Sequence, residues 1–154
     1  MLNIEMKTIP FEEMRYPTIG DYWDDKKNVC HGHGDFSNEK IELYRSANLG
    51  DWRMEFLVLL HEFIESHLNR NQGISEPDVK AFDEMFEEEV KKGLQPTDAE
   101  PGFDPRAPYR DNHALADLIE MMVAYKMGVN IDDYNDKLEE IWNTRNEAVN
   151  VEVK

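Results

Sequence analysis

The sequence is poor in cysteine and in long apolar stretches. Its 154 residues include one cysteine, Cys30, so the chain cannot form an internal disulfide, and a lone cysteine suits a reducing compartment. No stretch approaches the roughly eighteen uninterrupted apolar residues of a membrane-spanning helix. Residues 1–10 also lack the basic start and the apolar core of a signal peptide. These absences predict a cytoplasmic protein without a membrane partner.

Basic residues are also scarce. Lysine and arginine number 17 against 33 aspartates and glutamates, which gives a formal charge of −16. Binding to phosphate backbones relies on lysine and arginine, so we expect no nucleic-acid partner. The acidic excess suits cation binding or docking on a basic protein, and equally a surface that is merely well solvated. No particular protein partner can be read from the sequence.

Hydrophobic residues make up 40% of the chain, enough for one packed domain spanning residues 1–154. Within residues 1–50, polar and apolar side chains alternate, most clearly at Ile41–Arg45, which predicts a small antiparallel β region. The residues that separate the alternating segments are Gly20, Gly32, Gly34 and Asn38. Over residues 51–154 the apolar spacing becomes helical. The predicted fold class is α+β, a small N-terminal antiparallel β region packed on about four helices.

Four segments after residue 50 predict these helices. Asp51 is a candidate N-cap for a helix that runs to Leu68, and Ser75 caps a second helix. Prolines mark residues 93–112 as a long loop, of a kind that is usually functional or disordered. The remaining helices are expected over 111–127 and 132–147. We expect the methionines of the third helix to fill the core, namely Met121, Met122 and Met127.

The most informative segment is Leu59–Glu65, with the order H-E-x-x-E. It differs by one residue from the H-E-x-x-H of zinc helices, in which the first and fifth residues bind the metal and the second is the general base. At about 100° per residue, Glu65 lies about 40° from His61, and both lie at the centre of the apolar stripe. Glu62 lies at its edge, about 100° from His61. Ionisable groups on an apolar stripe are costly unless they are paired or bind a metal.

The third predicted helix repeats this pattern. With His113 as the reference, Glu120 lies about 20° away and Asp117 about 40° away, on the same core-facing stripe as Ala124 and Met127. Two helices that each direct a histidine and carboxylates inward satisfy these groups only if the groups converge. Two neutral imidazoles with one or two carboxylates form a ligand set for zinc or another divalent ion.

We therefore predict a site for a divalent metal, with zinc as the expected ion. The predicted ligands are His61, Glu65 and His113. Glu120 is either a further ligand or a residue that orients one, and Asp117 is an orienting residue. The alternative is a buried histidine–glutamate hydrogen-bond network without an ion.

Other histidines are weaker candidates. His31-Gly32-His33 has a spacing that can chelate a metal, but a pair separated by glycine is more typical of a turn. His67 lies about 120° from His61 around the helix, so we expect it to pack or to face solvent.

Several segments occur in a fixed order after residue 50. They are Asp51–Val58, His61–Glu65, Gly73–Ser75, Ala81–Asp83 and Asp104–Arg110, followed by His113. In this order the chain resembles a group of small, uncharacterised bacterial and phage-associated proteins, over roughly the two thirds of the chain that follow residue 50. The resemblance implies kinship and carries no activity.

The segment around His61 is also similar to the active-site helix of zincin-type metallopeptidases. In that family a strand precedes the H-E-x-x-H helix and a later helix supplies the third ligand, an order that Ile41–Arg45 and His113 match. Glu65 departs from the pattern, because the family has a second histidine there. The resemblance implies a hydrolase that acts on a peptide or a small molecule.

The leading function is a small metal-binding protein with a zincin-like hydrolase site. Glu62 would activate a water molecule that attacks a carbonyl. The alternative is a non-enzymatic acidic interaction protein whose histidine–glutamate cluster is structural, and the resemblance to phage-associated proteins suggests a phage origin for it. A substrate cleft would separate these alternatives, and none can be recognised in the sequence.

Overall fold

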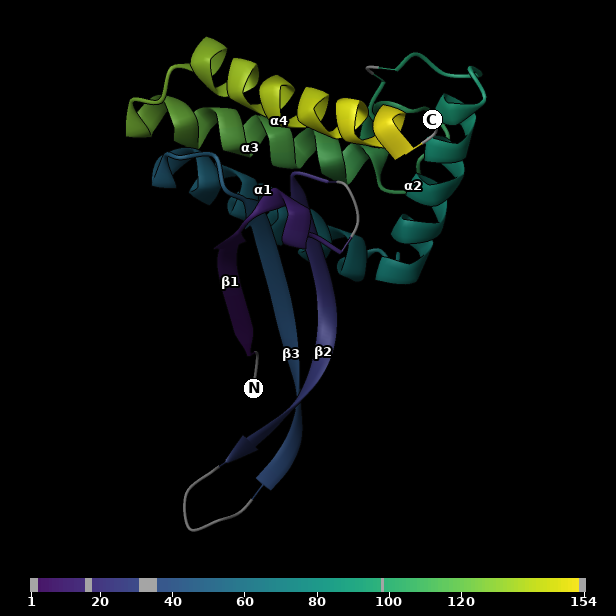
Figure 1. Ribbon diagram of the computed structural model, residues 1–154. Coiled ribbons are helices and arrows are strands. Elements are labelled where there is room, and N and C mark those ends of the chain that lie inside the picture. The colour runs from purple at the N-terminus through teal and green to yellow at the C-terminus, as the bar shows by residue number, and fades with distance from the viewer. Residues whose placement is uncertain (1–2, 16–17, 31–35, 98, 153–154) are drawn as a thin grey trace.

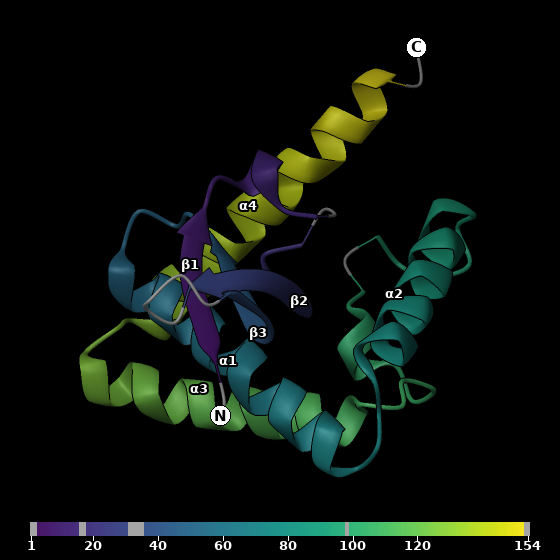
Figure 2. The ribbon, with the colours of Figure 1, turned by 90° about the horizontal axis from the view of Figure 1, so that it is seen from below.

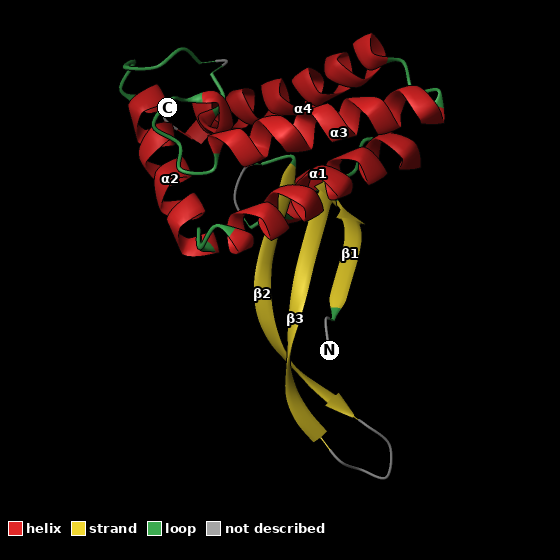
Figure 3. Ribbon diagram, turned by 180° about the vertical axis from the view of Figure 1, so that it is seen from behind, coloured by secondary structure: helices red, strands yellow, loops and turns green. Residues whose placement is uncertain are grey.

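The computed structural model describes residues 3–15, 18–30, 36–97 and 99–152. These residues form a three-stranded sheet and four α-helices, so the predicted α+β class is confirmed. In chain order the elements are β1 (Ile4–Ile9), η1 (Phe11–Glu13), β2 (Gly20–Cys30), β3 (Phe36–Ala47), α1 (Trp52–Asn71), α2 (Glu76–Lys91), η2 (Pro101–Phe103), α3 (Arg110–Met127) and α4 (Ile131–Glu152). The helices gather at one end of the sheet, and the β2–β3 hairpin projects away from them (Figures 1 and 3).

The sheet is mixed, with the strand order β1-β3-β2. β2 and β3 pair antiparallel as predicted, but β1 pairs with β3 in parallel. A parallel neighbour needs a crossover connection, and here η1 and the whole of β2 provide it. Two predicted breaks also lie inside strands, since Gly20 begins β2 and Asn38 pairs with Asn28.

Two predicted helix starts and one predicted helix end are confirmed by their caps, whereas α1 runs three residues beyond the predicted Leu68 and α4 continues to Glu152 instead of ending at 147. The carboxylate of Asp51 accepts a hydrogen bond from the backbone N–H of Arg53 at the start of α1. Ser75 and Asp78 form a reciprocal capping box at the start of α2. α3 ends at Gly128, whose φ of 69° lies in the left-handed region that favours glycine.

α1 is enclosed by the sheet on one side and by α3 on the other. Tyr44 of β3 packs against Phe63 with ring centroids 5.5 Å apart, and the Tyr44 hydroxyl is 3.0 Å from Ser66 Oγ. α3 runs antiparallel to α1, and α4 diverges from α3 (Figure 2). One buried cluster joins these helices, formed by Leu49, Leu57, Val58, Ala124, Val129 and Tyr134. Because α1 has packing partners on both sides, its polar residues toward α3 are also enclosed.

The methionine prediction is wrong for two of three residues. Met127 packs against the core cluster, but Met121 is 54% exposed and Met122 is 63% exposed. Helical geometry explains the difference, because α3 meets α1 through small side chains such as Ala116 and Ala124, and the methionines lie away from that side. They share an outward apolar face with Leu115, Leu118 and Tyr125. None of the helices in the described part of the chain is long and apolar enough to cross a membrane.

Candidate metal centre

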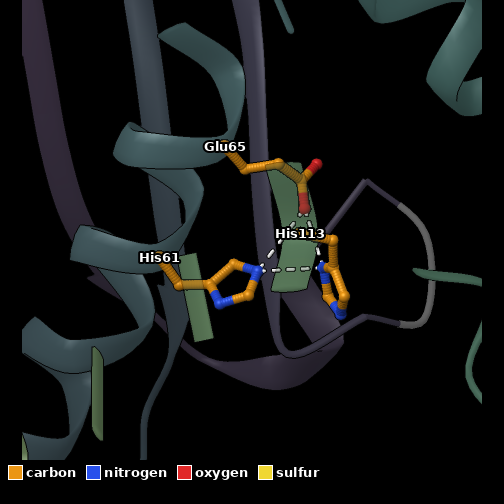
Figure 4. Close-up of side chains that lie close together, drawn as sticks. All are labelled: His61, Glu65 and His113. Carbon is orange, nitrogen blue, oxygen red and sulfur yellow. Dashed lines mark hydrogen bonds and ion pairs between the residues drawn. The ribbon is translucent and has the colours of Figure 1, made fainter. Parts of the chain in front are cut away.

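Three predicted ligands meet where α1 and α3 lie side by side. His61 and Glu65 are one turn apart on α1, and His113 lies in the first turn of α3 (Figure 4). His61 Nε2 is 3.1 Å from His113 Nδ1 and 3.4 Å from Glu65 Oε2. The third edge of this triangle, between His113 Nδ1 and Glu65 Oε2, is 2.8 Å. The structure thus joins residues that are 48 or more positions apart in sequence.

The triangle fits a small divalent ion. Tetrahedral zinc with ligands at about 2.0–2.1 Å places its ligand atoms about 3.3 Å apart, close to the observed edges. His61 and Glu65 are 8% and 5% exposed, so the surrounding protein shields two of the three ligands from solvent. The ligand atoms of these three residues lie within 4.8 Å of one another. The same is true of a second group, formed by His61, Asp117 and Glu120. The described residues therefore contain histidine and carboxylate groups that could hold a metal.

Glu120 and Asp117 lie beside the second ring nitrogen of His61, Nδ1. His61 Nδ1 is 2.9 Å from Glu120 Oε2 and 3.1 Å from Asp117 Oδ1. The two ring nitrogens point in different directions, so an ion held by Nε2 lies on the side of the ring away from Glu120. Metal-bound histidines usually donate their other N–H to a carboxylate, which fixes the ring. Glu120 and Asp117 are placed to orient His61 toward such an ion.

The histidines and carboxylates of this cluster shift one another's pKa values. Burial opposes the charged form of His61, but hydrogen bonds with the carboxylates, Asp117 first among them, raise the pKa of His61 well above its usual value. Burial also opposes ionisation of Glu65, yet the hydrogen bonds with His113 and His61 lower the pKa of Glu65 to about 2. A proton on His61 and a divalent ion are thus alternative sources of the positive charge that these carboxylates require.

A buried amide network supports the site. Asn69 is 1% exposed and donates from Nδ2 to the Tyr22 hydroxyl at 3.0 Å and to Glu65 Oε1 at 3.3 Å. Asn112 donates to Asn69 Oδ1 at 2.8 Å and exchanges two further hydrogen bonds with Gln72. This network was not predicted from the sequence, although its signal is present there, because Asn69 follows Glu65 by one helical turn and Asn112 directly precedes His113.

Glu62 lies on the wall of a cleft instead of on a solvated edge. Its carboxylate packs against Gly20 of β2 so closely that a Cβ there would lie 2.2 Å from Glu62 Oε1. Burial raises the pKa of Glu62 well above its usual value; His61 opposes this, while Glu65, Asp21 and Asp83 add to it. Glu62 makes no hydrogen bond to any residue that the structure describes, which leaves its carboxylate open to a ligand.

The cleft itself could not be recognised in the sequence. It has a volume of about 620 Å³, and its lining includes the three ligands, Glu62 and residues from β2, α2 and α4. Asp83 of α2 lies in its wall and accepts a hydrogen bond from the Tyr109 hydroxyl. Burial raises the pKa of Asp83 to about 7, and the nearby Glu65 adds to this shift. A cleft of this size is large enough for a small-molecule ligand.

The far edge of His113 is closed by a glycine. A Cβ added to Gly102 of η2 would lie 2.4 Å from His113 Cδ2 and 2.5 Å from Nε2. His113 Nε2 is buried and has no hydrogen-bond partner among the described residues. The contact with Gly102 holds the imidazole so that Nδ1, and not Nε2, faces His61 and Glu65.

Of the weaker histidine candidates, the structure describes His67, which lies outside the cluster. His67 packs on the far side of α1, with its ring 4.3 Å from that of Phe63 and 6.4 Å from that of Tyr44, as expected of a packing residue. His31, Gly32, His33 and Gly34 lie outside the described residues.

No family model, characterised protein or solved structure matches this chain. The function must therefore be argued from the chemistry of the site.

Proposed function

We propose that the protein binds one divalent ion, zinc, through His61, Glu65 and His113 and uses it to hydrolyse a small-molecule or peptide substrate. The observation that supports this most is the triangle of His61 Nε2, His113 Nδ1 and Glu65 Oε2, with edges of 2.8–3.4 Å. As part of the same proposal, the protein acts in the cytoplasm and has no nucleic-acid partner.

The residues of the cleft have separate roles in this proposal. Zinc lowers the pKa of a water molecule toward neutrality and polarises a carbonyl group. Glu62 would accept a proton from that water, because its carboxylate makes no other hydrogen bond and lies beside His61 and Glu65. Asp117 and Glu120 would hold the His61 ring, with the Nδ1 proton shared between them.

The second candidate is a non-enzymatic acidic interaction protein with a structural cluster. One observation favours it, namely that the cluster is largely satisfied by its own contacts. His61 Nδ1 lies 2.9 Å from Glu120, and His113 Nδ1 lies 2.8 Å from Glu65. A buried network of this kind can stabilise a fold without an ion.

Metal content separates the two candidates. We expect about one zinc per chain by elemental analysis of protein purified without a chelator or a histidine tag. An ion that binds the native state alone adds roughly 3–4 kcal/mol at a hundred- to thousand-fold excess over its dissociation constant. The melting temperature should therefore rise with zinc in the wild type, and this rise should vanish in His61→Ala and His113→Ala. Zinc well below one per chain, together with a melting temperature that neither zinc nor a chelator changes, would favour the structural network.

Activity is tested with Glu62→Gln. This variant should keep the ion and the fold but lose turnover by on the order of a hundredfold or more, because it removes the general base. The assay is a panel of peptide, amide and ester substrates with zinc-loaded protein. Glu88→Gln, which changes an exposed carboxylate on α2 that pairs with Lys91 away from the cleft, is the matched control and should keep full activity. Equal rates in wild type and Glu62→Gln would rule out this role for Glu62.

A further inference from the structure

The walls of the cleft carry many carboxylates and few basic groups. The lining carboxylates are Asp21, Glu62, Glu65, Glu76, Asp83, Glu100, Asp117, Glu120 and Glu139. Lys80 is the basic lining residue, and its ammonium group pairs with Glu84. Arg15 supplies a second positive charge nearby, which it shares between Asp21 and Glu76.

Most of these charges have a partner inside the protein or in the proposed site. Arg15 pairs with Asp21 and Glu76, and the two histidines contact the carboxylates that surround them. Four lining carboxylates differ from this pattern; Glu100 and Glu139 are exposed to solvent, whereas Glu62 and Asp83 are half-buried. In the described part of the chain, neither Glu62 nor Asp83 lies within ion-pair distance of a lysine or an arginine, and Asp83 accepts a hydrogen bond from the neutral hydroxyl of Tyr109. An enclosed carboxylate without a cation is costly, so a cationic ligand would relieve both.

The spacing of these groups does not suit a second metal ion. Two groups of described residues place three ligand atoms within 4.8 Å of one another. Both groups contain His61, and neither contains Glu62 or Asp83. A larger organic cation fits the cleft better, because its volume of about 620 Å³ leaves room beside the proposed metal. Tyr22 and Tyr109 also line the cleft, and tyrosine rings attract ammonium and guanidinium groups.

From this geometry we propose that the cleft selects substrates that carry an alkylammonium or guanidinium group, with Asp83 as the residue that binds this charge. The inference rests on the proposed hydrolase function, which supplies the reaction, and it adds the class of substrate. The cation would lie against Asp83 between the rings of Tyr22 and Tyr109, within the field of Glu62 and Glu65. Substrates with a carboxylate in that position would be excluded by like charge.

The test is calorimetric titration of zinc-loaded protein with matched probes. Nα-acetyl-lysine amide is compared with Nα-acetyl-norleucine amide, and cadaverine with 1,5-pentanediol, so that each pair differs in positive charge at similar length. We expect the cationic member of at least one pair to bind tenfold or more tightly than its neutral partner. Preference for the lysine amide would indicate a peptide side chain as the natural ligand, and preference for cadaverine a free amine.

A variant of Asp83 then tests where the positive charge of the probe binds. Asp83→Asn keeps the acceptor for Tyr109 but removes the negative charge, so it should weaken the cationic probe about tenfold and leave the neutral probe unchanged. Zinc content, measured on the same samples, should stay at about one per chain. Glu88→Gln removes the same charge from the exposed side of α2, where Glu88 pairs with Lys91 away from the cleft, and should bind the probes as the wild type does.

The outcomes separate this inference from the proposed function. Equal affinity for charged and neutral probes would overturn the inference. The same loss in Glu88→Gln as in Asp83→Asn would also overturn it, since the effect would then follow net charge alone. Absence of zinc from the wild type would overturn the proposed function. Zinc at one per chain without any preference for cations would leave the metal site standing and overturn the substrate class.

Discussion

Replacing Asn69 with alanine should destabilise both the fold and the metal centre. Asn69 is 1% exposed and hydrogen bonds three groups on three elements, namely Tyr22 on β2, Glu65 on α1 and Asn112 on α3. Each buried polar group that loses its partner costs about 1–3 kcal/mol. Asn112 keeps its hydrogen bonds with Gln72, so its loss is partial. The expected total is about 2–5 kcal/mol, a large share of the 5–15 kcal/mol by which domains are typically stable.

The assay is urea unfolding followed by circular dichroism, with chelator and with excess zinc. The denaturation midpoint should fall while the slope stays constant, because the surface exposed on unfolding barely changes. Zinc should also bind about tenfold or more weakly, because Glu65 loses a residue that orients it. Asn71→Ala, at the exposed end of α1, is the matched control and should change stability by less than about 0.5 kcal/mol. A loss below about 1 kcal/mol in Asn69→Ala would refute the view that this amide network joins α1 to α3.

Two further predictions follow from groups beside the metal centre. In Gly102→Ala, the added Cβ would lie 2.4 Å from His113 Cδ2, so the imidazole must move. The affinity for zinc, measured by competition with a chromogenic chelator, should drop at least tenfold. An unchanged affinity would contradict the proposed role of His113 Nδ1. In Asp83→Asn, stability should become less sensitive to pH. Burial raises the pKa of Asp83 from its ordinary value of 3.8 to about 7 in the folded protein, so the stability that this group contributes is present below pH 4 and is lost as the pH rises to 7. The variant should therefore gain on the order of 2–4 kcal/mol over wild type at pH 8 and nothing at pH 4, and parallel pH profiles for the two proteins would contradict this reasoning.

Residues with regular spacing could be predicted well from the sequence. The apolar period of α1 and α3 placed His61, Glu65 and His113 on the sides that face each other, and the caps at Asp51, Ser75 and Gly128 set the helix ends. These features depend on local geometry, which repeats along the chain.

Features that depend on distant contacts could not be predicted. The parallel pairing of β1 with β3 requires knowledge of where the chain returns after β2. The cleft depends on how α2 stands against α1, so Asp83 and Tyr109 gave no periodic signal. Met121 and Met122 were assigned to the core because hydrophobicity alone does not tell which side of a helix has a packing partner.

The contact between Glu65 and His113 closes a loop of 48 residues, and α2 lies inside that loop. With a single cysteine the chain cannot make an internal covalent cross-link, and an ion shared by α1 and α3 would join these helices in the folded protein alone. Because such an ion is released on unfolding, folding itself must close this loop, at an entropic cost of roughly 4 kcal/mol by the estimate used for disulfides, before the ligand set is complete. This cost stays modest only while the backbone between the two helices is unbroken. Proteolytic cleavage between Lys92 and Tyr109 would keep all three ligands in the molecule but make their assembly the association of two fragments, so the ion should bind more weakly, and it would free the end of α2 that is otherwise tethered beside the cleft.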